Sequence, residues 1–389
     1  MNISLPSAPI TCNPNPPRQP VLKVIGLGGG GQNAIDRMIE LGITGVDFIA
    51  ANTDAQVLRT SLAPVKVQLG PLLTRGLGAG GDPATGEAAA EESLKELSIA
   101  LAGADMVFLT AGMGGGTGTG SIPVAARIAK SLGAVVVAIV SLPFAFEVGR
   151  RQKNAREGLA KLQQYTDTLI SVPNDRLLQI APRDLPLDMA FRLADDILRQ
   201  GIQGISELIT QPGLINVDFS HVRNMMKNGG GSLLAIGTGQ GENRVIDALE
   251  HALHHPMLET INLEDASGII ANFTGGADLS FAEVMDALNT LHDRTNGNAE
   301  IIPGVICDNK MEDRVQVILV LTGIGATSIE SSNLHHSNQS PQPVVKKSVE
   351  FSSKTDTSSQ TTEADYQLEM AGAPVDLDIP AFLRRRVSR

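Results

Sequence analysis

Aromatic side chains and cysteine are scarce in this chain of 389 residues. It has no tryptophan, two tyrosines, ten phenylalanines and two cysteines, yet 42% of its residues are hydrophobic. Its cores must therefore be built from aliphatic residues and alanine. Because Cys12 and Cys307 lie far apart in unlike contexts, they indicate a reducing compartment and not a disulfide framework.

Basic charge and long apolar runs are also missing. The net charge is −11, and the only dense basic cluster is Arg384–Arg386. Nucleic acid is not an expected partner, because phosphate-backbone binding requires a basic face. No apolar stretch reaches the roughly 18 residues that cross a bilayer. Residues 1–20 carry six prolines and no apolar segment, which is unlike a signal peptide. We therefore expect a cytoplasmic protein without direct membrane insertion.

Glycine, in contrast, is abundant, at 40 residues, and much of it gathers in short runs. Residues 114–121 read Gly-Gly-Gly-Thr-Gly-Thr-Gly-Ser, between the apolar run Met106–Ala111 and the helix-like stretch Pro123–Leu132. Glycine allows backbone N–H groups to turn toward an anion, and a helix N-terminus adds the positive end of its dipole. This run predicts a phosphate-binding loop.

A second glycine run, Gly26–Asn33, also separates a strand pattern from a helix pattern. Taken alone, it fits a dinucleotide-binding turn as well as a mononucleotide site, so an NAD(P)-dependent oxidoreductase is one interpretation. No lysine follows a glycine anywhere in the chain, which excludes a GK[ST] P-loop. Two glycine loops without that lysine resemble the tubulin-like mode of nucleotide binding.

Short apolar runs alternate with helical patterns from Val21 onward. The predicted strands are Val21–Ile25, Val46–Ala51, Met106–Ala111, Val135–Ser141 and Leu169–Val172, and the predicted helices are Asn33–Leu41, Gly86–Leu101 and Asn154–Gln164. This alternation predicts an α/β fold with a doubly wound, mostly parallel sheet. Ligands of such sheets bind at the carboxyl ends of the strands.

A long helix, about Leu187 to Thr210, is expected to join this sheet to a second, smaller α/β domain. That domain has predicted strands at Leu233–Ile236, Gly268–Phe273, Glu300–Cys307 and Val315–Leu321, and predicted helices at Glu242–His254 and Phe281–His292. Residues 326–374 are rich in Ser, Thr, Gln and Pro and predict a disordered linker. The apolar cluster that follows it is a candidate docking peptide.

These motifs resemble those of the tubulin/FtsZ GTPase superfamily, and of bacterial FtsZ within it. The resemblance covers roughly Val21 to Ile324 and the terminal peptide Asp376 to Arg386. It implies a disordered arm at 1–20, a GTP-binding domain at 21–182, a central helix at 183–210, a C-terminal activation domain at 211–325, the linker at 326–374 and a docking peptide at 375–389.

The resemblance also implies a site for GTP and GDP, with Mg²⁺ held on the phosphates mainly through water. Asp195 would read guanine by accepting from N1–H and the 2-amino group, which adenine lacks. Phe191 would stack on the base and Glu147 would accept from the ribose. Without the resemblance, Asp195 would more readily be read as part of a solvated helix face. The implied nucleotide-binding residues are Gly28, Gly29, Gly30, Gly31, Asn33, Asn52, Gly78, Ala79, Gly80, Gly114, Gly115, Gly116, Thr117, Gly118, Thr119, Glu147, Arg151, Asn174, Phe191 and Asp195.

None of these loops supplies an obvious general base for hydrolysis. The resemblance places the catalytic residues after the long helix, in a loop that inserts into the nucleotide site of the next subunit. Asn216 and Asp218 match the family pattern there, whereas His221 replaces a second aspartate. A histidine is partly neutral at pH 7 and could still orient a water. The predicted catalytic residues are therefore Asp218, Asn216 and His221, with no side-chain metal ligands.

The implied function is a self-assembling cytoskeletal GTPase that polymerises head-to-tail and builds the cell-division ring. Hydrolysis would take place at the subunit interface and would be activated by polymerisation. The peptide 376–386 would bind membrane-tethering division adaptors, at midcell on the inner face of the membrane. An alternative, motivated by His221, is a nucleotide-gated structural filament or co-assembling paralogue with weak hydrolysis.

Overall fold

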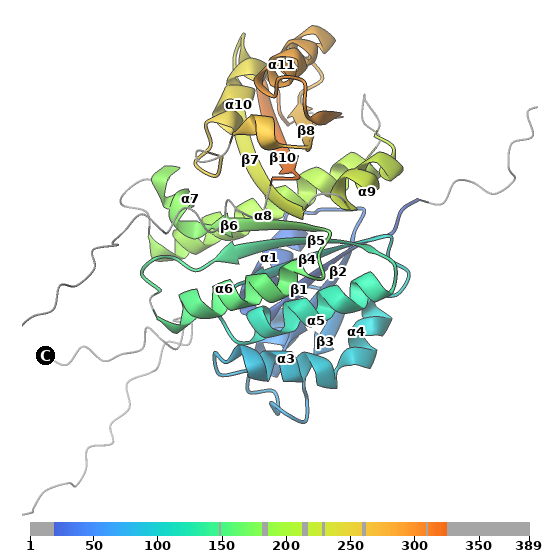
Figure 1. Ribbon diagram of the computed structural model, residues 1–389, viewed down its shortest axis with the longest axis vertical. Coiled ribbons are helices and arrows are strands. Elements are labelled where there is room, and N and C mark those ends of the chain that lie inside the picture. The colour runs from blue at the N-terminus through green and yellow to red at the C-terminus, as the bar shows by residue number, and fades with distance from the viewer. Residues whose placement is uncertain are drawn as a thin grey trace, which may run out of the picture. The chain divides into compact units, whose positions relative to one another are not determined.

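The computed structural model describes residues 19–147, 149–180, 186–211, 217–227, 230–258, 262–308 and 310–324, all within one compact unit (Figure 1). The described strands form a sheet in the order β3-β2-β1-β4-β5-β6-β7-β10-β8-β9. Most of the predicted N-terminal arm, the linker at 326–374 and the docking peptide at 375–389 lie outside these residues.

The first six strands of the sheet are parallel, as the sequence predicts. They are β1 (Leu22–Leu27), β2 (Asp47–Asn52), β3 (Val65–Gln68), β4 (Met106–Gly112), β5 (Val135–Leu142) and β6 (Thr168–Pro173). Strand order reverses between β1 and β4, which is the switch point where ligands bind in such sheets. We call the side on which these strands end the carboxyl edge, and the opposite side the amino edge.

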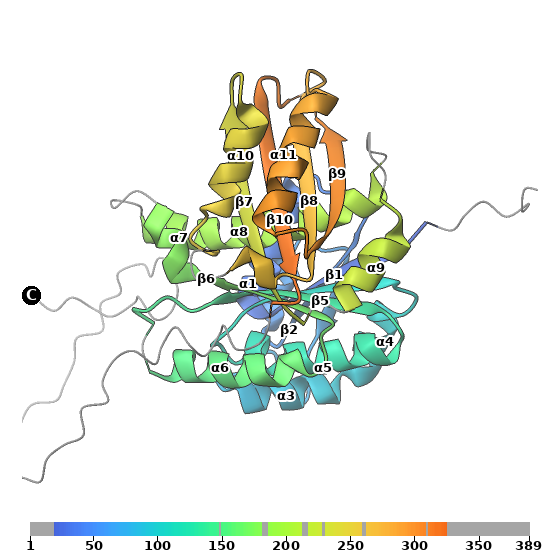
Figure 2. The same ribbon diagram turned by 45° about the horizontal axis from the view of Figure 1, so that its top comes forward.

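Helices cover both faces of this parallel sheet, which is why its strands read as continuous apolar runs. One face packs on α3 (Pro83–Glu92), α4 (Leu94–Leu101), α5 (Thr117–Ser131) and α6 (Arg150–Gln163), which lie together in Figure 2. The other face packs on α1 (Gly28–Glu40), α2 (Ala55–Thr60), α8 (Leu187–Thr210) and α9 (Phe219–Lys227). A short helix, α7 (Asn174–Ile180), follows β6.

The predicted single helix Gly86–Leu101 is wrong, because the structure breaks it into α3 and α4 at Ser93. The Ser93 hydroxyl donates to the carbonyl of Gln68 at 3.2 Å and accepts from the N–H of Gly70 at 3.0 Å. These two hydrogen bonds tie Ser93 to the end of β3, and its φ of −103° and ψ of 27° are not those of a helix. Here it fixes the start of α4 against the end of the edge strand β3.

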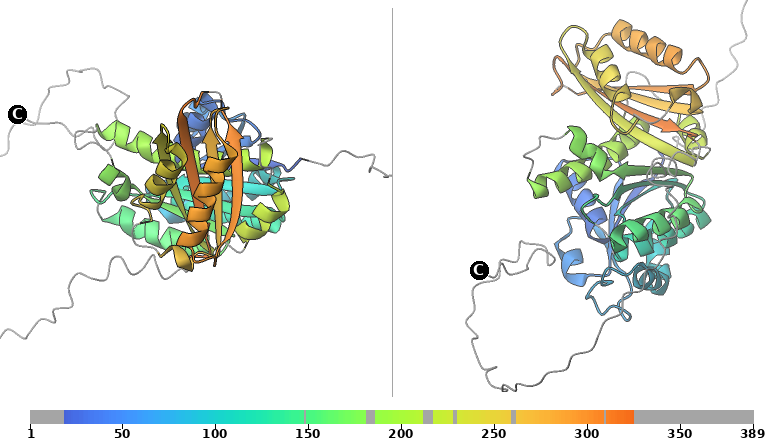
Figure 3. Two further views of the ribbon diagram at one scale, coloured as in Figure 1. Left: turned by 90° about the horizontal axis from the view of Figure 1, so that it is seen from above. Right: turned by 60° about the vertical axis from the view of Figure 1, so that its left-hand side comes forward.

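The second domain is also an α/β unit, as predicted. It consists of β7 (Gly230–Gln240), α10 (Arg244–Leu253), the short 3₁₀ helix η1 (Leu263–Asp265), β8 (Gly268–Gly275), α11 (Phe281–Arg294), β9 (Glu300–Cys307) and β10 (Arg314–Thr322). Strand β7 continues the sheet beside β6 in parallel, whereas β10 pairs antiparallel with β7 and β8. Figure 3 shows α10 (yellow) and α11 (orange) on one side of these strands, where they share an apolar core.

The long helix α8 has the bounds that the sequence predicts, Leu187 to Thr210. Its apolar stripe, including Leu198, Ile202 and Ile205, is buried in one core with residues of β5 and of the second-domain strand β10. At a rise of about 1.5 Å per residue, the helix is about 36 Å long. Within the part of the chain that the structure describes, no helix is both long and apolar enough to cross a membrane.

Candidate functional site

Two helices begin side by side at the carboxyl edge, at the switch point of the sheet. Helix α1 starts at Gly28, directly after β1, and α5 starts at Thr117, shortly after β4. A β-carbon at Gly28, which has φ +69°, would lie 2.8 Å from the backbone nitrogen of Gly118. The two helix starts therefore meet at a separation that only glycine permits. We call these first turns, Gly28–Gly31 and Thr117–Thr119, the cradle.

The cradle is helical and not a loop, which corrects the expectation that a helix begins at Pro123. Proline usually marks the first turn of a helix, but Pro123 lies inside α5. Its missing N–H deprives the Thr119 carbonyl of its helical partner. The correction strengthens the predicted chemistry, because the first N–H groups of a helix lack helical partners and carry the positive dipole end. Two such ends side by side form an anion site.

The residues between β4 and α5 hold the start of α5 in place. Gly114 has φ +102° and its N–H donates to the Thr119 hydroxyl at 2.8 Å. A β-carbon at Gly114 would lie 2.9 Å from the carbonyl oxygen of Arg151. Gly115 is half-buried, and Gly116 is the N-cap of α5. The Thr119 side chain thus closes this turn where α5 begins.

The predicted covering loop, Gly78–Gly80, lies against the same helix start. Gly78 and Gly80 have positive φ values of +89° and +59°, and Ala79 is buried. A β-carbon at Gly116 would lie 3.0 Å from the Ala79 side chain. Asn154 of α6 donates to the carbonyls of both Gly81 and Gly114, at 3.4 and 3.3 Å. The loop is therefore anchored beside the cradle from two sides.

Glu147 and Arg151 lie together at the end of β5 and the start of α6. Glu147 accepts from the N–H of Phe144 at 3.0 Å and forms an ion pair with Arg151. Phe144 contacts Phe191 of α8 edge-to-face, with ring centroids 5.3 Å apart. The structure thus brings the predicted ribose and base residues to one place at the carboxyl edge.

Two acceptors at this end of the site have no hydrogen-bond donor among the described residues. Asn174 is 5% exposed, and its side-chain oxygen has no hydrogen-bond partner among residues 19–324 as far as they are described. Asp195 lies one turn after Phe191 on α8, half-buried, and no described side chain donates to its carboxylate. Burial, and secondarily the neighbouring charge of Asp196, raise the pKa of Asp195 to about 7. Buried acceptors are costly without donors, so this arrangement suits a planar ligand with several N–H groups.

Two further predicted asparagines, Asn33 and Asn52, differ from one another in burial. Asn33 is exposed on α1, whereas Asn52 is buried at the end of β2. The Asn52 side chain donates to Gln32 at 3.4 Å and accepts from the N–H of Asp54 at 3.1 Å. It therefore fastens β2 to α1. Sequence reasoning missed its neighbour Thr53, which is fully buried with its hydroxyl oxygen 2.6 Å from that of Thr117.

Asp218 and His221 do not join this site. They lie exposed at the start of α9, where Asp218 accepts from the N–H of Ser220 at 2.9 Å. That hydrogen bond holds the pKa of Asp218 below its ordinary value. The hydroxyl of Thr168, the first residue of β6, donates to the Met226 carbonyl of α9 at 2.6 Å. Helix α9 is therefore at the amino edge. Asn216 lies outside the described residues.

Helix α8 spans the distance between the two edges. Phe191 near its start contacts Phe144 at the carboxyl edge. A β-carbon at Gly45, which precedes β2, would lie 2.8 Å from the Thr210 hydroxyl at the last residue of α8. Phe191 and Thr210 are about 28 Å apart along the helix axis. One molecule thus carries the cradle at one edge and Asp218 at the other.

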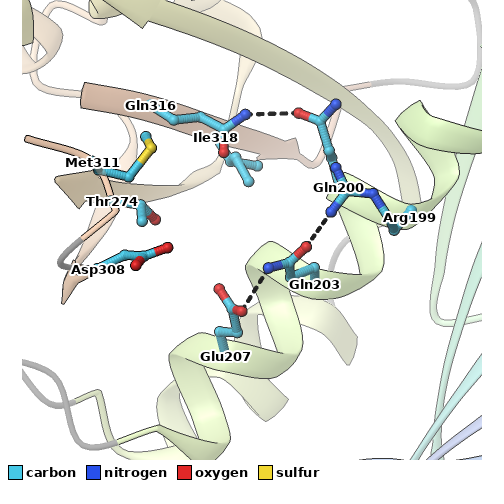
Figure 4. Close-up of a pocket in the computed structure, with 9 residues that line it drawn as sticks. All are labelled: Arg199, Gln200, Gln203, Glu207, Thr274, Asp308, Met311, Gln316 and Ile318. Atoms are coloured by element: carbon cyan, nitrogen blue, oxygen red, sulfur yellow. Dashed lines mark hydrogen bonds between the residues drawn. The ribbon is translucent and has the colours of Figure 1, made fainter. Parts of the chain in front are cut away.

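A separate polar cavity of about 100 Å³ lies between α8 and the second-domain strands (Figure 4). Gln316 of β10 donates to Gln200 at 2.7 Å, and Gln203 donates to Glu207 at 2.7 Å. Burial raises the pKa of Glu207. None of the predicted site residues lines this cavity. The Gln316–Gln200 hydrogen bond fastens the second domain to α8, whereas the Gln203–Glu207 bond lies within that helix.

Comparisons with known proteins identify the fold. Residues 21–182 match the Tubulin/FtsZ family, GTPase domain, and residues 230–325 match the FtsZ family, C-terminal domain. An empty FtsZ dimer from M. jannaschii is 45% identical, with a TM-score of 0.76, over 79% of this chain and 89% of that chain. The chain belongs to the FtsZ family. A mutant of the M. jannaschii protein is equally similar, at 45% identity and a TM-score of 0.76, covering 79% of this chain and 92% of the mutant.

A more distant structure shares the fold alone. CetZ2 from Haloferax volcanii, described as a GTPγS-bound protofilament, is 22% identical with a TM-score of 0.68, over 79% of this chain and 94% of its own. Membership in the FtsZ family makes the first domain a GTPase domain, which binds GTP and GDP and hydrolyses GTP. The interpretation of the first glycine run as the turn of an NAD(P)-dependent oxidoreductase is therefore wrong.

Proposed function

We propose that this FtsZ-family GTPase polymerises head-to-tail and hydrolyses GTP where Asp218 of one subunit meets the nucleotide of the next. The placement of the cradle and Asp218 at opposite edges is the observation that carries this proposal. A contact between the carboxyl edge of one molecule and the amino edge of an identical one is heterologous. Heterologous contacts that do not close produce filaments.

The chemistry of the two edges is complementary under this proposal. Backbone N–H groups of the cradle would bind the phosphates and stabilise the negative charge that develops during hydrolysis. Asp218 is ionised at neutral pH, since its pKa lies below the ordinary aspartate value of 3.8 because of the Ser220 N–H. An exposed, ionised carboxylate can orient a water and accept its proton. The M. jannaschii relative is described as a dimer, which supports self-association.

Mg²⁺ is proposed to sit on the phosphates and to be held mainly through water. Two carboxylates near the cradle, Asp54 and Asp82, already cap helices by accepting backbone N–H groups of α2 and α3. Among the residues that the structure describes, no group of three or more His, Cys, Asp or Glu side chains could hold a metal ion. Such surroundings suit an ion that keeps several waters and binds substrate phosphates.

The cellular role that we propose is the division ring, on the inner face of the membrane at midcell. The peptide 376–386 would tether the filament to membrane-bound adaptors, and it lies outside the described residues. Its apolar cluster followed by three arginines supports a docking role. A structural filament with weak hydrolysis is not favoured by the FtsZ-family matches, and only His221 argues for it.

Turnover that depends on protein concentration tests this proposal. GTP hydrolysis per subunit should rise steeply above a threshold concentration, because dilute monomers lack a complete site. The same threshold should appear in sedimentation with GTP, and GDP should not support pelleting at that concentration. Phosphate release and pelleting measured on the same dilution series check this. Constant turnover per subunit down to concentrations without polymer would refute the interface site.

Replacing His221 by aspartate should raise turnover per assembled subunit. His221 lies one turn beyond Asp218 and is exposed at the same edge, so a carboxylate there would add a second acceptor for the attacking water. The measurement is phosphate release divided by pelleted protein. His254→Asp, at an exposed histidine that follows α10, serves as the control and should leave this ratio unchanged. An equal or lower ratio for His221→Asp contradicts the prediction.

A further inference from the structure

Thr53 has a buried hydroxyl group next to Thr117, the first residue of α5 in the cradle. It follows the last residue of β2, is 0% exposed, and its hydroxyl oxygen lies 2.6 Å from the hydroxyl oxygen of Thr117. That is the ordinary distance of a hydrogen bond between two hydroxyl groups. The two residues are 64 positions apart, so only the fold brings them together.

Thr117 occupies the point where the two helix starts meet. It is the first residue of α5 and is half-buried. A β-carbon at Gly28 would lie 3.3 Å from the β-carbon of Thr117. An anion bound by the free N–H groups of both helices would therefore lie next to the Thr117 hydroxyl.

The direction of the hydrogen bond decides what this hydroxyl can do. In the pair itself, either oxygen can be the donor. A hydroxyl has one proton, whereas a phosphate oxygen at neutral pH only accepts. If Thr117 gave its proton to Thr53, it would present a lone pair to the phosphate, which is repulsive. If Thr53 gives its proton to Thr117, the proton of Thr117 is free for the phosphate.

We propose that Thr53 is a positioning residue for nucleotide binding: it donates to Thr117 and so fixes the Thr117 hydroxyl as a donor to a bound phosphate. The inference rests on the proposed function, which places nucleotide phosphates at the cradle. Two consecutive hydrogen bonds that end on an anion also polarise one another, which strengthens both.

The surroundings of Thr53 hold its side chain in this position. Its carbonyl accepts from the Thr74 hydroxyl at 3.3 Å, and the next N–H, of Asp54, donates to the Asn52 side chain at 3.1 Å. Threonine is stiff at χ1 because its β-carbon is branched. A buried, stiff side chain on a fixed backbone loses little entropy when it orients its neighbour, so Thr117 is ordered before the phosphate arrives.

Isosteric substitution tests the inference in dilute protein, where assembly plays no part. Thr53→Val keeps the shape and removes the donor, whereas Thr53→Ser keeps the hydroxyl. Thr322→Val is the matched control: Thr322 is 1% exposed in β10, and its hydroxyl donates to the Gly268 carbonyl at 3.2 Å, far from the cradle in the chain. The readouts are the affinities for GDP and for guanosine, which has no phosphate, by competition with a fluorescent guanine nucleotide.

Thr53→Val should weaken GDP binding about fivefold, the usual loss for one hydrogen bond between neutral groups, and leave guanosine binding unchanged. Thr53→Ser and Thr322→Val should bind both ligands as the unsubstituted protein does. In a Thr117→Val background, Thr53→Val should cause no further loss, because the two residues act in series. Should Thr53→Val fail to fold, Thr53→Cys replaces it, since a thiol is a weak donor of similar size, and GDP binding should weaken severalfold.

Three results would overturn the inference. They are unchanged GDP binding by Thr53→Val, an equal loss for GDP and guanosine, and a further loss in the Thr117→Val background. Failure of the unsubstituted protein to bind GDP would instead refute the nucleotide site itself and this inference with it. Failure to assemble, with GDP binding intact, would refute only the proposed filament.

Discussion

Asp218→Ala should reduce GTP turnover at least about 100-fold and leave GTP affinity unchanged, because a positioned base contributes a factor of this order or more. Asp218 is exposed at the amino edge, and α8 places that edge about 28 Å from the base side of the same molecule. The substitution therefore cannot touch the molecule's own nucleotide. Phosphate release from pelleted protein and nucleotide affinity in dilute protein are the two measurements.

Mixing two inactive variants gives a sharper result. Asp195→Asn should bind GTP only weakly but still presents Asp218, whereas Asp218→Ala holds GTP but presents no base. Where the carboxyl edge of an Asp218→Ala subunit meets the amino edge of an Asp195→Asn subunit, the contact has both a bound GTP and an Asp218. The mixture should therefore regain turnover. Asp195→Asn alone, at the same total protein concentration and at a GTP concentration that saturates Asp218→Ala, should stay inactive. Full turnover by Asp218→Ala, or an inactive mixture with it, would contradict an interface site.

Much of the fold follows from local sequence patterns, because the strands of a parallel sheet are buried on both faces. Val135–Ser141 and Leu169–Val172 differ from β5 and β6 by one residue or less at each end. Helix α8 has the predicted bounds, since Pro186 precedes it and Gln211-Pro212-Gly213 follows it. In both cases the deciding interaction, burial of an apolar run or a helix-stopping residue, is visible within a few positions.

The cradle could not be predicted in detail, because its conformation is decided by distant residues. Glycine is a poor helix former, so Gly28 and Thr117 read as loop residues. They are helical because two helix starts meet there, and only small residues fit. Thr53 carries no motif, and its role depends on Thr117, 64 positions away. Ser93 breaks a helix for the same kind of reason, a hydrogen bond to the neighbouring strand.

For the site residues, too, the sequence supplied identities and the structure supplied positions. The resemblance to a known family supplied Asp218 and Asp195 as residue types and implied that Asp218 acts on the nucleotide of the next subunit, but it gave no distance between the two in one molecule. That separation depends on the parallel sheet and the direction of α8, which only the structure provides. The family resemblance therefore identified the residues, and the topology gives the physical reason why Asp218 and Asp195 lie at opposite edges of one molecule.

Asp195→Asn should change the base that the protein binds. The carboxylate can accept from both N1–H and the 2-amino group of guanine, whereas an amide presents its own N–H to one of these donors. GTP affinity should fall about 100-fold, because one hydrogen bond to a charged carboxylate is replaced by two N–H groups that face and repel one another. Xanthosine triphosphate, which has a carbonyl in place of the 2-amino group of guanine, should bind more tightly than GTP. Asp196→Asn is the control: Asp196 forms an ion pair with Arg199 at 2.7 Å, and its loss should leave base preference unchanged.

The same substitution should make stability less dependent on pH. Burial raises the pKa of Asp195 from 3.8 to about 7, so between these values the folded protein binds more protons than the unfolded chain. The free energy of unfolding therefore falls as pH rises through this window and levels off above it. Asp195→Asn removes that penalty, so its gain in denaturation midpoint over the unsubstituted protein should be larger at pH 8 than at pH 5. GTP affinity of the unsubstituted protein should weaken below about pH 7, because protons compete with guanine for the carboxylate. Equal gains in denaturation midpoint across this range would mean that the folded protein carries no energetic cost for the ionised Asp195 carboxylate, and would contradict this prediction.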